Sequence, residues 1–317
     1  MVSKMRNESI AKRKSSLARS TLSDKIFLII VYAVLFAIAF ACMYPIYFAV
    51  IASFSEGHAV YSGDVNWLPK GFTLGAYQLV FQNDKIWRGY LNTIFYTVCG
   101  TLFNLFLTIP TAYALSKKRM YGRGVIMTLF IITMYFGGGM IPTYLLMDKM
   151  NLINTPWIMI ISGGISVYNV VVTRTYFMNS IPEGLYEAAR IDGANEIYIF
   201  RKMALPLSAP ILAVMTLYYA VGHWNSYFNA MIYISNQKLH PLQVILRRIL
   251  ILNETAYEDA LESGASMELL KDAAHAAYMA VTMKYALVLI ACLPMLIAYP
   301  FVQKYFVKGI MIGSLKE

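Results

Sequence analysis

The chain has 317 residues, of which 58% are hydrophobic and only 14% are charged. Soluble domains usually carry about 25% charged residues, so this composition excludes an ordinary water-soluble protein and favours one that lies in lipid. The net charge of +10 would suggest nucleic-acid binding in a soluble chain, but the placement of the charges argues against nucleic acid as a partner.

Six stretches without a charged residue are long enough to cross a bilayer as helices, which takes roughly 20 predominantly apolar residues. Hydrocarbon offers the backbone no hydrogen-bond partners, so we expect these stretches to be helical. The sequence therefore predicts an all-α, polytopic membrane protein with six transmembrane helices. In chain order the stretches are Ile26–Phe54, Gly89–Ser116, Gly124–Met147, Met150–Thr173, Met203–Gln237 and Tyr285–Gln303.

The basic residues are distributed unevenly between the two sides of such a protein. With the N-terminus in the cytoplasm, the cytoplasmic segments carry 18 of the 27 Lys and Arg residues and a net charge of +11, against −1 outside. This positive-inside bias predicts a multi-pass protein of the cell (plasma or inner) membrane with both termini cytoplasmic. The predicted parts are a basic tail at 1–25, a six-helix transmembrane domain at 26–308 with external loops at 55–88 and 236–284, and a C-terminal tail at 309–317.

The sequence lacks the patterns that catalysis and metal binding require. Cys42, Cys99 and Cys292 lie in predicted spans without metal-ligand spacing, and the four histidines are scattered. No H-E-x-x-H, G-x-S-x-G or G-x-x-x-x-G-K-[ST] motif occurs. We therefore expect no catalytic residue, no metal and no cofactor bound by this chain, and an intramembrane enzyme is the less favoured alternative.

The loop at 180–206, between the fourth and fifth spans, is predicted to contain two short helices joined by a bend. Ser180 and Glu183 have the spacing of a capping box, and Gly193 tolerates the positive φ at which a helix ends. Asn195 can cap the second helix, and Leu205-Pro206 is expected to separate that helix from the fifth span. A bent helix pair in a cytoplasmic loop is typical of a docking element.

The same loop carries a recognisable motif. Glu187-Ala188-Ala189 is followed by three residues, Gly193, nine residues and then Met203-Ala204-Leu205-Pro206. This spacing resembles the EAA loop of permease subunits of ATP-binding-cassette importers, and only Met203 departs from the usual Ile. The small alanine side chains would let another protein approach closely. The likeness extends over 20–317 and is closest to maltose-permease-like subunits of the subgroup that imports complex oligosaccharides.

The resemblance implies a channel-forming permease subunit that imports a sugar or oligosaccharide by alternating access. Its implied partners are membrane lipid, a second permease subunit (normally a different chain), an external solute-binding protein and two ATPase subunits. The ATPase subunits bind ATP and Mg and drive the transport cycle through the 180–206 loop. A permease for another class of solute remains an alternative. The implied coupling residues are Glu183, Tyr186, Glu187, Ala188, Ala189, Asp192 and Gly193.

The fifth span carries side chains suited to a sugar path, because sugars bind to aromatic faces and to hydroxyl-bonding groups. The candidates are Trp224, Asn225, Tyr227 and Asn229. Asn225 and Asn229 are four residues apart, so they would share one face of a continuous helix. The competing interpretation of these residues is interhelical hydrogen bonding, together with an aromatic belt where the fifth span meets the outer surface.

The third span contains a run of glycines at 137–139, followed by Pro142. Such a run is expected to break the helix, and irregular backbone at membrane depth is tolerated only against protein or a water-filled cavity. Gly138 and Gly139 are therefore predicted to lie on the substrate path. A helix that ends early at the outer face is the competing interpretation.

Overall fold

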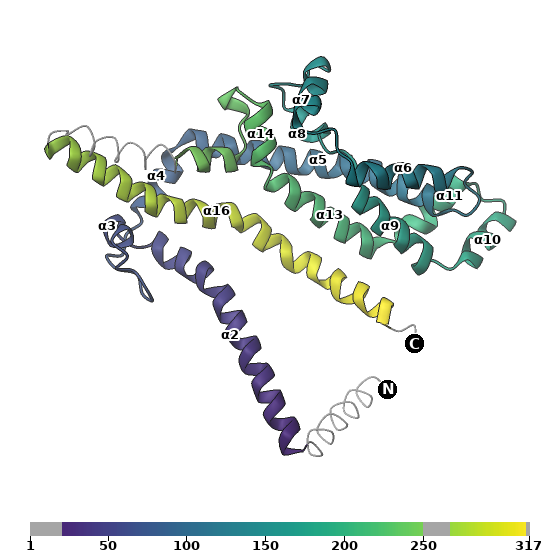
Figure 1. Cartoon of the computed structure of the whole chain (residues 1–317), viewed down its shortest axis with the longest axis horizontal. Coiled ribbons are helices and arrows are strands. Elements are labelled where there is room, and N and C mark those ends of the chain that lie inside the picture. Colours follow the sequence, from purple (N-terminus) through teal and green to yellow (C-terminus); the bar gives the residue numbers. More distant parts are fainter. Residues whose placement is uncertain (1–20, 250–266, 315–317) are drawn as a thin grey trace.

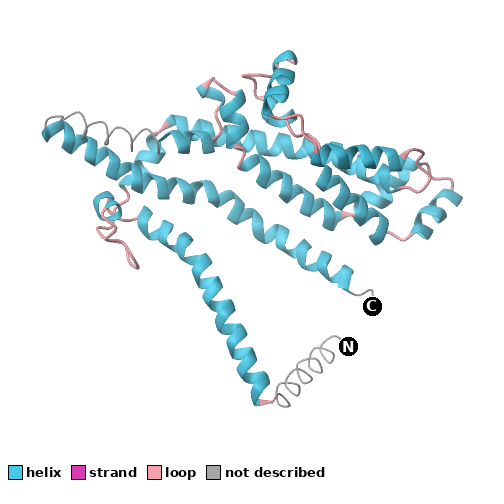
Figure 2. Cartoon of the chain, in the orientation of Figure 1, coloured by secondary structure: helices cyan, strands magenta, loops and turns pink. Residues whose placement is uncertain are grey.

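The computed structural model describes residues 21–249 and 267–314, and within them it contains helices and loops but no strand (Figure 2). This confirms the all-α prediction for those residues. The predicted tails at 1–25 and 309–317 and the predicted external loop at 236–284 lie partly outside the described residues. The long helices are α2 (Leu22–Ser53), α5 (Asp84–Ser116) and α16 (Met267–Ser314); the shorter ones are α3 (Gly57–Tyr61), α4 (Gly75–Gln82), α6 (Arg123–Tyr135), α7 (Met140–Lys149), α8 (Trp157–Ile161), α9 (Val167–Ser180), α10 (Glu183–Ile191), α11 (Glu196–Ile199), a π-helical turn (Phe200–Ala204), α12 (Leu205–Leu207), α13 (Ala209–Trp224), α14 (Tyr227–Tyr233), a 3₁₀ turn (Gln237–Leu239) and a helix at 242–249.

The three long helices correspond to the first, second and sixth predicted spans. Helix α2 begins with a capping box in which the Thr21 hydroxyl accepts from the Asp24 N–H and the Asp24 carboxylate accepts from the Thr21 N–H. Its 32 residues give a length of about 48 Å, which exceeds the thickness of a bilayer's hydrocarbon core. By length and composition, three helices of the described chain can cross a membrane alone.

The other three predicted spans are broken rather than continuous. Helices α6 and α7 meet at 114°, where Gly139 has a φ of +86°. Helices α8 and α9 are separated by residues 162–166, which include Gly163 with a φ of +77°. The prediction of six uninterrupted helices is therefore not confirmed: by length and composition, the described residues hold three continuous candidate spans, or up to five if each bent pair is counted as one span.

The entry into the fifth span differs from the prediction as well. The helical path from α11 through α12 includes Leu205 and Pro206, and the 79° bend follows at Ser208. The proline lies in the first turn of α12, directly after the π-helical turn, where a missing N–H is tolerated. The expected separation at Leu205-Pro206 was therefore placed two residues too early.

Helix α5 is the centre of the bundle, and α9 and α13 pack along it (Figure 1). One end of α5, at Asp84, lies beside α4 and the helix at 242–249, and the other, at Ser116, lies beside α10. Buried apolar side chains from α5, α9, α10 and α11 form a core at the Ser116 end. The two ends of the bundle therefore carry different sets of loops.

Helix α2 extends away from the rest of the chain (Figure 1). Only its last turns are buried, at Ala49 and Ile51–Ser53, where they pack near α3 and α16. Most of its apolar side chains are exposed, including Phe36 at 73% and Phe27 at 65%. An apolar surface of this extent requires lipid or another protein chain to cover it.

Candidate functional site

Helix α10 and the turn after it have the predicted form, with one exception. Gly193 has a φ of +80° and lets the chain leave the helix, and the Asn195 side chain accepts from the Tyr198 N–H at 2.8 Å to cap α11. The expected capping box is not formed, because Ser180 is the last residue of α9. The Glu183 carboxylate instead accepts from Lys118 Nζ at 2.6 Å, and this ion pair lowers the pKa of Glu183.

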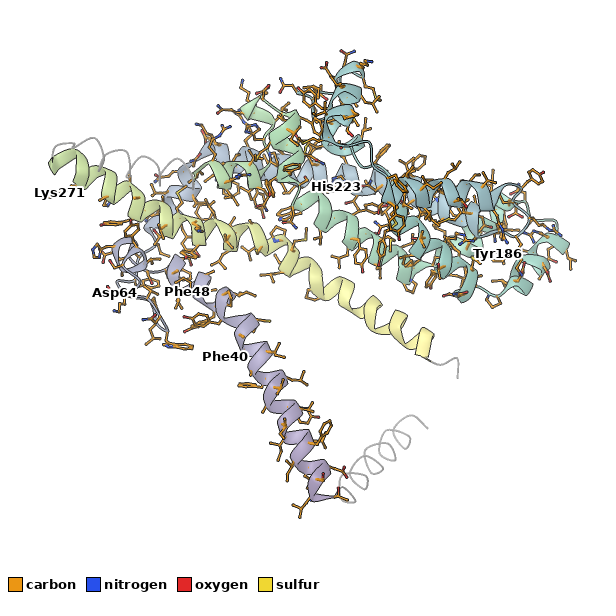
Figure 3. All side chains as sticks on the ribbon, viewed as in Figure 1. Phe40, Phe48, Asp64, Tyr186, His223 and Lys271 are labelled. Carbon is orange, nitrogen blue, oxygen red and sulfur yellow. The ribbon has the colours of Figure 1, made fainter. Side chains whose placement is uncertain are left out.

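The inner face of α10 packs against the chain's own core. Tyr186 and Ala189 are both 6% exposed, and the Tyr186 ring lies 6.3 Å from the ring of Tyr113 on α5. Figure 3 shows Tyr186 at this end of the bundle. Ala189 is therefore mostly covered by the chain itself, whereas its neighbour Ala188 is exposed. These two residues fix the orientation of α10 on the bundle.

The outer face of the loop exposes apolar side chains that the sequence pattern did not single out. Ile191 is 86% exposed, Ile197 69% and Tyr198 56%. A cavity of about 550 Å³ lies beside Tyr198 and is lined by Leu185, Ala188, Ala189, Asp192, Gly193, Ala194, Asn195, Tyr198 and Met203. The signal that could have identified these residues is the occurrence of large apolar residues in a loop that otherwise carries charges.

A second, smaller cavity of about 150 Å³ lies on the other side of α10. Its lining includes Glu187, Arg190 and the basic run Lys117–Arg119. Arg190 donates from Nη2 to Glu196 Oε1 at 2.8 Å and so ties α10 to α11. With Glu183 bound to Lys118, two ion pairs hold the loop together, and the whole unit is braced to the end of α5.

Lys117 follows directly after α5 and is an unusual cation. Its Nζ is buried without a hydrogen-bond partner among the described residues, and it lies 4.2 Å from the centroid of the Tyr113 ring and 2.9 Å from that of Tyr186. Ring faces attract a cation, but burial away from water penalises it. Burial dominates, and it lowers the pKa of Lys117 from its usual 10.5 to about 8.

We expect Lys117→Met to remove a pH dependence of stability. The unfolded chain binds more protons than the folded chain between pH 8 and 10.5, so folding of the wild type is stabilised as the pH rises through this window. After a discount for partial exposure, the gain is about 1 kcal/mol. Thermal unfolding of both proteins at pH 7 and pH 10 measures it. Equal pH responses would contradict the lowered pKa.

A buried polar cluster lies at the middle of the bundle, where Figure 3 places His223. Asn104 on α5 is 1% exposed and donates from Nδ2 to the carbonyl oxygens of Gly163 and Gly164, at 3.1 and 2.8 Å. Its Oδ1 lies 2.6 Å from His223 Nε2 on α13. One amide therefore joins two helices to the broken segment between α8 and α9.

The predicted path residues of the fifth span do not form one surface. Trp224 is 5% exposed and donates from Nε1 to the Ala291 carbonyl of α16 at 3.0 Å, so it acts in interhelical packing. Asn225 ends α13 and Asn229 lies in α14, so the expected shared helix face does not exist. Tyr227 is 42% exposed and faces the Arg247 guanidinium at 5.7 Å.

The glycines of the third span break the helix as expected. Residues 136–139 are not helical, and a Cβ added at Gly138 would meet no atom within 4 Å. Neither Gly138 nor Gly139 lines either of the two cavities beside α10. Their role on a substrate path remains a prediction.

Comparisons with known proteins agree with the motif and the fold. Residues 86–312 match the family described as "Binding-protein-dependent transport system inner membrane component". The polygalacturonan/rhamnogalacturonan transport system permease protein YtcP of Bacillus subtilis (strain 168) is 36% identical over 295 residues, which cover 93% of this chain and 100% of YtcP. Protein LplC of the same organism is 41% identical over 250 residues, 78% of this chain and 80% of LplC.

A solved structure has the same fold. A chain in the crystal structure of a bacterial ABC transporter involved in the import of the acidic polysaccharide alginate superposes with a TM-score of 0.79 at 36% sequence identity. The match covers 90% of this chain and 99% of that chain. The fold predicted from the loop motif is thereby confirmed.

Proposed function

The chain belongs to the family of inner membrane components of binding-protein-dependent transport systems, and from this premise we propose that it is the permease subunit of an ATP-driven importer of carbohydrate oligomers. The observation that carries the proposal is the α10–α11 loop. Its inner face is locked to α5 by Tyr186 and Ala189, and its outer face exposes Ile191, Ile197 and Tyr198.

The loop has the properties of a mechanical connection to an ATPase. Large apolar side chains that stay exposed on a polar loop favour a protein partner, because burying them releases free energy. A buried apolar core joins α10 and α11 to α5 and α9, and the exposed ion pairs of Glu183 and Arg190 add to it, so a pull on the loop reaches the spans. Closure of two ATPase subunits, which bind the ATP and Mg, would thus switch the spans between inward-open and outward-open states.

The proposed assembly contains four further chains. Helix α2 projects from the bundle with its apolar side chains exposed, which favours a second permease subunit, of a different sequence, that packs against it. Two ATPase subunits bind at the α10 ends, in the cytoplasm together with both termini. A solute-binding protein delivers the cargo at the opposite end of α5.

The proposed cargo is a carbohydrate oligomer, and acidic oligomers are favoured among these. YtcP is described as a polygalacturonan/rhamnogalacturonan permease, and the structural relative imports alginate, an acidic polysaccharide. Galacturonate units carry one carboxylate each at neutral pH. An importer for another class of solute is the second hypothesis, and membership in a transport family disfavours an intramembrane enzyme.

Affinity purification of the tagged chain in mild detergent, with the partners identified by mass spectrometry, tests the proposal. We expect an ATPase with a phosphate-binding loop and a second permease to be recovered, and the reconstituted complex to take up oligogalacturonates when ATP is supplied. Recovery of the chain alone, or uptake that does not depend on ATP, would contradict the importer assignment.

Single variants in the loop separate coupling from insertion. Glu187→Lys and Gly193→Asp are expected to leave the protein inserted in the membrane and to weaken ATPase recovery, because Glu187 is exposed beside the smaller cavity and Gly193 holds a positive φ. Gly184→Ala is the matched control, since a Cβ at Gly184 meets no atom within 4 Å and its φ is not positive. Normal transport in both loop variants would count against docking at this loop.

A further inference from the structure

A cationic pocket lies at the end of the bundle opposite α10. It has a volume of about 560 Å³, within the range of about 300–1,000 Å³ that is usual for small-molecule sites. Its walls come from the first turns of α5, from residues 236–240 and from the helix at 242–249. In the proposed orientation this end faces the outside, where the cargo arrives.

Four basic side chains line the pocket with one acidic one. The cations are Lys85, Arg88, Lys238 and Arg248, and the acid is Asp84. All four cations are exposed, and the ion pairs found within residues 21–249 and 267–314 involve none of them. The pocket therefore holds a net charge of about +3 on a side of the membrane where the predicted segments sum to −1.

The walls of the pocket are held in place before any ligand arrives. The Asn92 amide of α5 donates to the carbonyl oxygens of Lys238 and His240, at 2.8 and 3.0 Å, and the Tyr96 hydroxyl donates to that of Leu239 at 2.9 Å. The Thr93 hydroxyl accepts from the Leu242 N–H at 2.8 Å. One face of α5 thus fixes the backbone that carries two of the pocket's walls, which lowers the entropy cost of binding.

The remaining lining matches a sugar rather than a simple anion. Asn83 and Asn236 offer amide donors for hydroxyl groups, while their Oδ1 atoms already accept from the backbone N–H groups of Lys85 and Lys238. Gln237 offers an amide donor and acceptor, and Ile245 offers an apolar surface. Arg and Lys bind carboxylates through charge-assisted hydrogen bonds. A sugar acid presents both groups at once, whereas the phosphate of a lipid headgroup lacks the row of hydroxyls.

We propose that this pocket is an entry subsite that binds a carboxylate-bearing oligosaccharide, with Lys85, Arg88 and Arg248 as its carboxylate ligands. The inference rests on the proposed importer function and adds a place and a chemistry for the first contact with the cargo. The cationic lining selects for acidic over neutral oligomers and raises their local concentration at the mouth of the path.

The test uses the complete importer in nanodiscs of phosphatidylcholine, with fluorescent tetragalacturonate as the probe and its carboxyl-reduced tetramer as the neutral counterpart. We expect the acidic tetramer to bind more tightly than the neutral one, and the double variant Lys85→Gln/Arg88→Gln to weaken its binding by about tenfold or more. Lys149→Gln removes an exposed charge outside the pocket and should leave binding unchanged. Added salt should weaken binding to the wild type more than to the double variant.

Four results would overturn the inference. If the wild type binds the two tetramers equally, the pocket is not a carboxylate subsite. The same holds if wild type and double variant bind the acidic tetramer equally. If the double variant loses co-purified phosphatidylglycerol but still binds the acidic tetramer, the cations bind a lipid headgroup instead. Loss of recruitment of the solute-binding protein, with tetramer binding intact, would assign them to protein docking.

The same preparation separates this inference from the function on which it rests. ATP-driven uptake of the acidic tetramer by wild type and double variant alike, with equal binding, refutes the subsite alone. A wild-type complex without an ATPase, or without any ATP-driven carbohydrate uptake, refutes the importer assignment itself.

Discussion

Ile191→Asp is expected to separate the chain from its ATPase and to lower ATP-driven uptake by about a hundredfold, while the protein still inserts and melts as the wild type does. Ile191 is 86% exposed at the end of α10, so its replacement removes little contact within the chain. In a complex, a large apolar side chain at the centre of a contact contributes about 2–4 kcal/mol, and a carboxylate there must also lose its water. Co-purification of the ATPase and uptake into proteoliposomes measure the loss.

Two matched variants show whether the apolar contact is the cause. Ile191→Leu keeps the volume and the hydrophobic surface and should retain ATPase recovery close to that of the wild type. Lys202→Ala changes an exposed residue beyond α11, outside the larger cavity, and should have little effect. If Ile191→Asp kept its ATPase, the exposed apolar face would not be the docking surface.

The course of the α10–α11 loop was largely predictable because its signals are local. Gly193 and Asn195 act through their own backbone and their nearest neighbours, and both behave as the sequence indicates. Glu183 does not, since its carboxylate bonds to Lys118, 65 residues earlier in the chain. A local motif cannot report a competing partner that tertiary folding brings into reach.

The number of spans was less predictable, for a different physical reason. A stretch without charges shows that a segment can enter lipid, but it does not show that the segment is straight. Gly139 and Gly163 take positive φ values inside such stretches and interrupt them. The same limit explains the fifth span, where Asn225 and Asn229 have helical spacing in the sequence but lie on either side of a break.

The cluster around Asn104 could not be found from periodicity, because nothing in the sequence pairs a residue of α5 with the carbonyl groups at 163 and 164. Asn104 is one of several polar residues in an otherwise apolar stretch, so its presence alone does not mark the cluster. Asn104 donates both of its hydrogen bonds to those carbonyls, so its Oδ1 is an acceptor and the His223 Nε2 carries the proton. The amide thus supplies hydrogen bonds that the broken backbone of this span cannot make within a helix.

Asn104→Leu is therefore expected to destabilise the protein strongly, although the leucine side chain has the same number of heavy atoms and the same branching as that of asparagine. It takes the hydrogen-bond partner from two carbonyl groups and one imidazole N–H in a part-buried cluster, each at a cost of about 1–3 kcal/mol. We expect the melting temperature of the purified importer in detergent to fall by roughly 5–10 °C. Thr111→Val is the control, because the Thr111 hydroxyl bonds only to the Leu107 carbonyl of its own helix, at 2.7 Å.

Adding His223→Leu to Asn104→Leu separates the cost of orphaned polar groups from that of a disturbed fold. Once one partner of a hydrogen bond is gone, removal of the second adds less than it would alone. The melting temperature of the double variant should therefore fall by less than the sum of the falls in the two single variants. The carbonyls of Gly163 and Gly164 stay unpaired in both backgrounds, so recovery should be incomplete. Strict additivity would mean that Asn104 and His223 act independently, and the amide would then stabilise the broken span without help from α13.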